Sequence, residues 1–349
     1  MADFSSRDSF IKKVLISMGF IDTSKRPRRI IVRMLLTLVS TILCLVIAEF
    51  ALRFYFARNI NFDIEMSRYT NLGKVASPNP RIGHVHKKNI SEKLMGVLVE
   101  TNSDGLRDRE YVVDKTGKYR IIFVGDSLTF GWGVERQDTF EYLLEEQLNQ
   151  THDVEILNFG IGNYNTVQQV NLFEEKGLKY RPDQVTMFFF INDAELLKKT
   201  SSLEFLSNSQ LVTFYWSRLR GFFSDGSYES GYMDYYSRLY SDNSQGWQEA
   251  KAAMLKMKKL ALDNDFVFQV VLLPELHELV DYPFTELYGR VERFLNQNDI
   301  DVLDITSAFK DEADPIKLWV ARDDAHPNAR AHRIIANSSI EFVAGTIGQ

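Results

Sequence analysis

The sequence predicts an α/β protein with a doubly wound parallel sheet, preceded by one N-terminal transmembrane helix and a small strand-rich stalk. Three observations support this fold class. From about residue 118 onward, short apolar runs alternate with segments of helical period, as expected for strands and helices that alternate around a parallel sheet. A long apolar stretch lies near the N-terminus. Turn signals and short β-like pieces fill the region between these two parts.

Composition excludes several other classes of protein. Of the 349 residues, 45% are hydrophobic and only 8 are prolines, which excludes a disordered chain and a collagen-like chain. The formal net charge of −6 offers no general basic surface, so no nucleic-acid partner is expected. The single cysteine, Cys44, excludes an intramolecular disulfide framework and a cysteine-rich zinc site.

The apolar stretch from 30 to 52 predicts the membrane anchor. It contains 23 residues, and about 20 residues are enough to cross the hydrocarbon core of a bilayer. Its two charged residues, Arg33 and Glu49, lie near the ends, where long side chains reach the headgroup region. We therefore expect the lipid bilayer to be a partner of this chain through residues 30–52.

Charges beside the span predict its orientation. Eight lysines and arginines lie before or at the start of the apolar stretch, and three arginines follow it within 20 residues, which favours a cytoplasmic leader over residues 1–29. A cleavable signal peptide is the alternative, but no small-residue cleavage site follows the apolar run. The expectation is an uncleaved single-pass anchor in the inner membrane, with the remainder of the chain periplasmic or extracellular.

The remaining chain divides into two predicted parts. Residues 53–117 carry turn signals and short β-like pieces, which predict a stalk and a strand-rich segment. In this segment His84 and His86 stand two residues apart, a spacing that places both on one face of a strand. A metal site is not expected there, because no third ligand is in sight. Residues 118–349 are predicted to form the sheet domain.

Five strands and four intervening helical patterns are expected in the sheet domain. The strands are predicted at 119–125, 155–159, 184–191, 266–274 and 300–305. The helices are predicted from about 138 to 148 and at 165–177, 247–262 and 284–297. An aromatic-rich insertion, 194–246, separates the third strand from the fourth. Insertions at the carboxyl ends of parallel strands commonly shape a ligand site, and a helical subdomain packed on the core fits this composition equally well.

Candidate catalytic residues lie at the carboxyl edge of this sheet. Ser127 follows the first strand after a glycine, which allows a tight turn to present its hydroxyl above the sheet edge. His326 is expected on a loop, because Pro327 suits the first position of a final helix. Asp323, three residues before the histidine, is predicted to turn back and hold its Nδ1–H.

Four short blocks give this chain a resemblance to the SGNH/GDSL hydrolase family over about residues 119–345. The blocks are GDSL at 125–128, NFGIGNYNT at 158–166, IND at 191–193 and DDAHPN at 323–328. The resemblance implies an SGNH/flavodoxin-like fold, with Ser127 as nucleophile, His326 as base and Asp323 as the group that orients the base. It also implies an oxyanion hole made by the Ser127 N–H, the Asn192 side-chain amide and a backbone N–H of the second block.

The second block departs from the usual pattern of the family. Alignment on Asn158 places Asn163 where the family has a glycine, and Gly162 precedes it. A backbone N–H can donate whatever the side chain, and asparagine tolerates the left-handed region better than other non-glycine residues. Gly162 and Asn163 both remain candidate donors.

The expected activity is that of a membrane-anchored serine esterase acting on acyl groups, expected to be O-acetyl, of an envelope or extracellular polysaccharide. No cofactor and no metal are expected. The alternatives are an O-acyltransferase to a glycan, a lysophospholipase or thioesterase, and a non-catalytic scaffold in a polysaccharide assembly complex. Expected partners are an acylated glycan or another acyl ester and, in the last case, envelope polysaccharide assembly proteins.

Overall fold

The computed structural model describes residues 13–14, 17–18, 25–115, 117–197, 209–223 and 228–348. The chain forms two compact units. One consists of Met1–Asn59 with Ser209–Leu211, and the other of Ile60–Asn208 with Val212–Gln349. Most of the predicted leader over 1–29 therefore lies outside the described residues.

The first unit is dominated by the long helix α2, Lys25–Phe56. Its stretch Ile30–Phe56 is long and apolar enough to cross a membrane, and its most apolar 18-residue window is not buried among the described residues. Near its C-terminal end, the Glu49 carboxylate accepts hydrogen bonds from the backbone N–H groups of Gln210 and Leu211. The apolar stretch expected at 30–52 is thus a single helix with no protein core around it.

The second unit begins with a short helix and two small antiparallel sheets. These elements are α3 Phe62–Arg68, η1 Tyr69–Gly73, β1 Lys74–Ala76, β2 His84–His86, β3 Ser91–Leu94 and β4 Val97–Glu100. β1 pairs with β2, and β3 pairs with β4. The β3–β4 turn has positive φ at Met95 and Gly96, as a two-residue hairpin with right-handed strand twist requires. The region expected to be a stalk belongs, from Ile60 onward, to the same compact unit as the large sheet.

Five parallel strands form the central sheet, which confirms the predicted fold class. They are β5 Tyr119–Gly125, β6 Val154–Gly160, β7 Gln184–Phe189, β8 Val267–Leu272 and β9 Asp301–Asp304. The order in the sheet is β6-β5-β7-β8-β9. Because the chain moves outward in opposite directions from β5, the carboxyl ends of β5, β6 and β7 meet at a topological switch point, where α/β proteins bind ligands.

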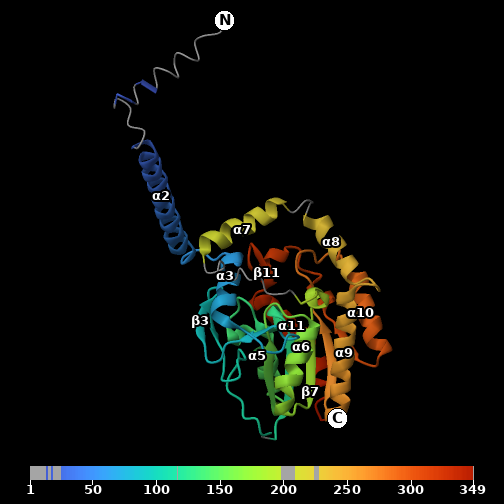
Figure 1. Ribbon diagram of the computed structural model, residues 1–349. Coiled ribbons are helices and arrows are strands. Elements are labelled where there is room, and N and C mark those ends of the chain that lie inside the picture. Colours follow the sequence, from blue (N-terminus) through green and yellow to red (C-terminus); the bar gives the residue numbers. More distant parts are fainter. Residues whose placement is uncertain are drawn as a thin grey trace. The chain divides into compact units, whose positions relative to one another are not determined.

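Helices cover both faces of the sheet (Figure 1). On one face α5 Phe140–Leu148 packs against α11 Ala329–Ala344. On the other face α6 Thr166–Leu172 packs against α9 Gln245–Asn264, and α9 contacts α10 Thr285–Gln297 through the rings of Trp247 and Phe294. Alternate residues of β5 enter the two cores, with Ile121 and Phe123 on the α5 side and Ile122 and Val124 on the α6 side. The predicted strand buried on both faces is therefore correct.

Shorter elements complete the second unit. They are α4 Ser127–Phe130, η2 Arg136–Asp138, η3 Phe173–Gly177, η4 Leu178–Tyr180, η5 Ile191–Ala194, η7 Thr306–Phe309, η8 Pro315–Leu318, β10 Trp319–Ala321 and β11 Asp324–Pro327. β10 and β11 form an antiparallel pair, so His326 lies on a strand rather than on the expected loop. Asn328 caps α11 by accepting the N–H groups of Arg330 and Ala331, and Pro327 precedes the helix instead of starting it.

The insertion 194–246 contains two helices in its described part, α7 Gln210–Phe223 and α8 Tyr228–Leu239. Residues 198–208 and 224–227 of the insertion lie outside the described residues. Toward its end, Tyr236 and Tyr240 are buried, and the Tyr240 hydroxyl donates to the Ile191 carbonyl. This end of the insertion packs on the core, as one of the two interpretations of its composition predicted.

Candidate active site

The turn after β5 presents Ser127 at the switch point of the sheet. Asp126 caps the single-turn helix α4, with its Oδ1 accepting the Leu128 N–H. A Cβ atom on Gly125 would lie 2.0 Å from the Thr129 hydroxyl, so only glycine allows the chain to fold this tightly. Burial raises the pKa of Asp126, although hydrogen bonds from Leu128 and Asn192 act in the opposite direction.

Ser127, His326 and Asp324 form a continuous chain of hydrogen bonds. His326 Nε2 lies 2.8 Å from Ser127 Oγ. His326 Nδ1 lies 2.5 Å from Asp324 Oδ1. Because a carboxylate can only accept, Nδ1 carries a proton and Nε2 is left to accept the serine proton. This is the order of groups in a serine–histidine–acid triad.

The prediction that Asp323 orients His326 is wrong. Asp324 and His326 are two residues apart in β11, and alternate side chains of a strand share a face. Asp323 lies one residue earlier in the preceding turn. Its Oδ2 accepts from the Asn61 side-chain amide and the Phe62 N–H, so this carboxylate caps the start of α3 instead.

Asp324 is held from several sides. It is 3% exposed, and its Oδ2 accepts from the indole Nε1 of Trp132 at 2.9 Å. Its Oδ1 also accepts the backbone N–H of His326. Burial works against ionisation, but the hydrogen bonds and the charge interaction with His326 hold the pKa of Asp324 below its usual value. The carboxylate is thus fixed and ionised beside the imidazole.

The loop after β6 lies directly beside the serine turn. Gly125 pairs with Gly160 in the sheet, and the Ile161 N–H donates to the Gly125 carbonyl. A Cβ atom on Gly160 would lie 2.3 Å from the Phe130 backbone nitrogen, so a glycine is required for this approach. Asn163 adopts φ +67°, the left-handed conformation that the sequence allowed for an asparagine.

Gly162 and Asn163 differ in what their N–H groups do. The Gly162 N–H donates to the Tyr69 hydroxyl at 2.9 Å. For the Asn163 N–H and the Ser127 N–H, the hydrogen bonds of the described residues include no acceptor. Of the two residues left open by the sequence, Asn163 therefore has the N–H that is free to donate.

The Asn192 side-chain amide is placed next to the serine turn. Its Nδ2 donates to Asp126 Oδ2 at 3.1 Å, which fixes the orientation of the amide. This bond uses one of the two amide hydrogens. Asp193, the next residue, is buried and accepts from Gln169 and the Phe190 N–H, so it stabilises the turn that carries Asn192.

A cavity of about 220 Å³ lies against the two asparagines. Most of the residues that line it have polar side chains. These residues are His84, Asn163, Tyr164, Asn165, Gln168, Asn192, Glu195, Leu196 and Leu197. The volume is enough for part of a sugar ring or a short acyl group.

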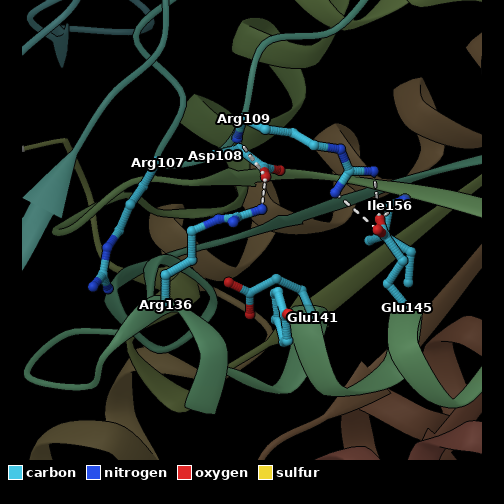
Figure 2. Close-up of a pocket in the computed structure, with 8 residues that line it drawn as sticks. Arg107, Asp108, Arg109, Arg136, Glu141, Glu145 and Ile156 are labelled. Atoms are coloured by element: carbon cyan, nitrogen blue, oxygen red, sulfur yellow. Dashed lines mark hydrogen bonds and ion pairs between the residues drawn. The ribbon is translucent and has the colours of Figure 1, made fainter.

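A second group of charged residues comes from the segment 107–109, from Arg136 and from helix α5 (Figure 2). Asp108 accepts from Arg136, and Arg109 is paired with Glu145. Burial raises the pKa of Glu141, in the same cluster, to about 7. The space among these side chains is only about 10 Å³, room for about one water molecule, so this cluster is structural rather than a binding site.

Several residues that build this site were not predicted from the sequence. Asp324 has a sequence signal, because an acid two residues from the histidine shares its face when the segment is a strand. Trp132, which holds Asp324, and Tyr69, which accepts from Gly162, have none, since each of these contacts joins residues far apart in the sequence. Of the two histidines noted for their spacing, His84 bonds to the Gly162 carbonyl of the same loop, and His86 reaches that loop through Tyr69.

Comparisons with solved structures find similarities at low sequence identity and with TM-scores below 0.5. LAE5, an α/β hydrolase enzyme from the metagenome of Lake Arreo in Spain, is 16% identical, with a TM-score of 0.43 over 68% of this chain and 98% of its own. An acetylxylan esterase from Geobacillus stearothermophilus is 16% identical, with a TM-score of 0.43 over 68% and 97%. A putative lipolytic protein of the G-D-S-L family from Desulfitobacterium hafniense is 17% identical, with a TM-score of 0.40 over 64% and 98%. No curated protein matches this chain.

The family comparison is more specific. The model of the GDSL-like lipase/acylhydrolase family matches residues 123–334, which is more than half of the 349 residues. The matched range contains the serine turn, the β6 loop, the Asn192 turn and the strand that carries Asp324 and His326. The chain thus belongs to the GDSL-like lipase/acylhydrolase family and is a serine hydrolase that acts on ester bonds.

Proposed function

We propose that this protein is a membrane-anchored esterase that removes acyl groups, in particular O-acetyl groups, from an envelope or extracellular polysaccharide. The observation that carries the proposal is the hydrogen-bonded chain Ser127–His326–Asp324 at the carboxyl edge of the sheet. The catalytic roles assigned to these residues, and to Asn163 and Asn192, are part of the proposal.

The reaction begins with attack of Ser127 Oγ on the carbonyl carbon of the ester. As the new C–O bond forms, the serine proton passes to His326 Nε2 and the carbonyl oxygen becomes an oxyanion. His326 then gives its proton to the leaving sugar oxygen, the ester C–O bond breaks, and an acyl-enzyme remains. Water, deprotonated by His326, adds to the acyl carbon, and release of the acid regenerates Ser127.

Three donors stabilise the oxyanion in this proposal. They are the Ser127 N–H, the Asn163 N–H and the second hydrogen of the Asn192 amide. Each lies on a turn fixed by other hydrogen bonds, so the donors need little reorganisation during the reaction. Loss of one such donor costs on the order of 3 kcal/mol of transition-state stabilisation.

The character of the cavity supports a glycan substrate. Sugars present many hydroxyl groups, which pair with amide, imidazole and carboxylate side chains like those in the walls of this cavity. A lysophospholipase or thioesterase that binds a long acyl chain gains from an apolar tunnel, whereas Leu196, Leu197 and Tyr164 are the apolar and aromatic contributions here. The ester is therefore assigned to a sugar and the acyl group to a short chain.

Three alternatives are retained as outcomes of the same experiment. An O-acyltransferase shares the acyl-enzyme and differs only in that a sugar hydroxyl replaces water. A lipid hydrolase has the same catalytic groups and a different acyl pocket. A scaffold in a polysaccharide assembly complex requires no turnover at all.

The location of the protein is also part of the proposal. Helix α2 spans the inner membrane with its N-terminus in the cytoplasm and the sheet domain outside.

The test is turnover of aryl esters by the detergent-solubilised full chain, with Ser127→Ala as the control. We expect the rate to fall from acetate to butyrate to octanoate. A preference for octanoate indicates the lipid hydrolase, because each buried CH₂ group adds about 0.8 kcal/mol of binding in an apolar tunnel. An acetylated oligosaccharide then separates hydrolysis from transfer: release of acetate without a gain of mass on an added acceptor sugar supports the esterase. Absence of turnover on every ester favours the scaffold.

A further inference from the structure

The backbone N–H and the carbonyl oxygen of Gly162 both form hydrogen bonds to residues that lie before the matched family region. Tyr69 accepts from the Gly162 N–H, and His84 Nε2 lies 3.1 Å from the Gly162 carbonyl oxygen. That carbonyl belongs to the same peptide unit as the Asn163 N–H. Any movement of this peptide therefore moves the proposed oxyanion donor.

Tyr69 is itself fixed by a buried relay. His86 Nδ1 lies 3.2 Å from the Gly105 carbonyl, which can only accept, so Nδ1 carries the proton. His86 Nε2 is then an acceptor, and the Tyr69 hydroxyl donates a hydrogen bond to it at 2.6 Å. The hydroxyl oxygen keeps its lone pairs for the Gly162 N–H. The direction of each bond from Gly162 to Gly105 is thus determined.

Burial makes this relay rigid. Tyr69 and His86 are 1% and 2% exposed, and their rings pack edge to face at 5.7 Å. The Tyr69 ring also meets Trp132 at 5.1 Å, and Trp132 holds Asp324. One aromatic cluster therefore supports both the acid of the triad and the oxyanion loop.

His84 is oriented from the other side of the loop. Its ring packs against Tyr164 at 5.0 Å, and the Tyr164 hydroxyl donates to the His84 carbonyl. Burial and the nearby charge of Lys74 lower the pKa of His84 to about 4, so the imidazole is neutral near pH 7 and Nε2 donates its single proton to Gly162. Lys74 in turn donates to Asn163 Oδ1 at 2.7 Å, which fixes the side chain of the left-handed residue.

We propose that His84 and Tyr69 are positioning residues of the oxyanion hole, which hold the Gly162–Asn163 peptide so that its N–H is aimed and polarised toward the developing negative charge. A hydrogen bond to the Gly162 carbonyl draws electron density from the peptide and strengthens its N–H as a donor. The inference deepens the proposed function and rests on it, since it presumes that Asn163 donates to the oxyanion. It also makes Tyr69 and His84 part of the active site, although they precede the matched family region 123–334.

The test compares His84→Leu and Tyr69→Phe in the detergent-solubilised full chain. Each substitution removes one of the two hydrogen bonds to Gly162 while preserving much of the side-chain volume. We expect kcat and kcat/KM on an aryl acetate to fall together, about tenfold to a hundredfold, with KM little changed, because a misplaced donor weakens only the transition state. His84→Gln retains a side-chain N–H donor, and we expect it to recover a large part of the loss. His152, an exposed histidine away from the site, provides the matched control His152→Leu, which should leave kcat unchanged.

A second readout separates positioning from general stability. An aryl trifluoromethyl ketone adds to Ser127 Oγ, the serine proton passes to His326, and the adduct carries an oxyanion. Its inhibition constant should rise in His84→Leu by the same factor as kcat/KM falls. Wild-type kcat and inhibition in both variants would overturn the inference. A loss confined to the melting temperature would do the same. If Ser127→Ala retains full turnover, the proposed function itself fails, whereas loss of turnover in Ser127→Ala with no change in His84→Leu removes only this inference.

Discussion

The Asp324 carboxylate meets the His326 imidazole at 2.5 Å because both side chains project from the same face of β11. Asp323, its immediate neighbour in the sequence, instead caps α3 by accepting the Phe62 N–H. The Phe62 ring lies near the His326 ring, with 6.0 Å between their centroids. Two adjacent acids thus support the same histidine, one directly and the other through the segment that covers it.

Because Asp324 and Asp323 contact different groups, we expect unequal effects on ester turnover when each is removed. Asp324→Ala leaves the His326 tautomer unfixed and its positive charge unpaired, so we expect ester turnover to fall by about three to four orders of magnitude. Asp323→Ala removes a cap at a helix terminus, which costs about 1 kcal/mol of stability, and we expect turnover to stay within tenfold of wild type. The measurement is kcat/KM on an aryl acetate for both variants. Equal losses would contradict the assignment of Asp324.

Ser127 and His326 are expected to behave as one unit. Ser127→Ala and His326→Ala should each remove nearly all turnover, because neither the nucleophile nor the base acts without the other. The double variant should then be no worse than either single one. Circular dichroism of each variant provides the control for folding, and multiplicative losses in the double variant would argue against a shared step.

Much of the fold follows from local patterns in the sequence. β5 was predicted with the bounds that the structure has, because a short run of apolar residues ending in a glycine permits few alternatives. The order of the blocks also placed Ser127, Asn192 and His326 at one edge, since the carboxyl ends of parallel strands meet there. Patterns of this kind depend on a few consecutive residues, which is why they can be read from one sequence.

Other parts of the site depend on contacts that no local pattern carries. A loop before His326 predicts that Asp323 turns back to the histidine, but pairing with β10 makes residues 324–327 a strand and leaves Asp323 in the preceding turn. That pairing reverses which acid faces the histidine. Tyr69 is 93 residues from Gly162 in the sequence, so its hydrogen bond to the oxyanion loop follows only from the packing of the N-terminal segment on the sheet.

Arg107 provides a test of how the serine turn is supported. Its buried guanidinium, 2% exposed, donates to the carbonyl oxygens of Phe130, Gly131 and Val134, at the end of α4 and just after it. Arg107→Met leaves these three acceptors without their donor, and we expect the free energy of unfolding to fall by about 3 kcal/mol. Arg107→Lys should recover only part of it, because one ammonium cannot reproduce a planar fork. Urea unfolding of the wild type and the two variants measures the differences in the free energy of unfolding. Full recovery by lysine would show that positive charge alone, without the planar guanidinium, stabilises these carbonyl groups.

The proposed topology predicts the behaviour of reporter fusions. Positive charges are concentrated before the apolar helix, which favours retention of the N-terminus in the cytoplasm. Alkaline phosphatase fused after residue 349 should therefore be active, and a reporter that works only in the cytoplasm should be inactive at the same position. The opposite pair of results would place the sheet domain in the cytoplasm and remove the extracellular glycan from consideration.

Buried histidines predict that the protein loses stability in mild acid. His332 is fully buried, its Nδ1 accepts the Phe140 N–H, and burial lowers its pKa from 6.5 to about 3. Between these two values the unfolded chain binds a proton that the folded chain does not, so lowering the pH favours unfolding. Above pH 6.5 the two states bind the same number of protons at this residue, and the effect disappears.

One substitution isolates the contribution of His332 to this pH dependence of stability. A histidine with this shift contributes a loss of about 2 kcal/mol in the free energy of unfolding between pH 7 and pH 5. His332→Asn keeps an acceptor near the position of Nδ1 and removes the titration, so its stability should fall less than that of the wild type over the same range. Urea unfolding of the detergent-solubilised full chain at the two pH values provides the comparison. His86, whose pKa is also lowered to about 3 by burial, remains in both proteins, and its contribution cancels in the difference. Parallel losses in the two proteins would mean that His332 takes up its proton in the folded state.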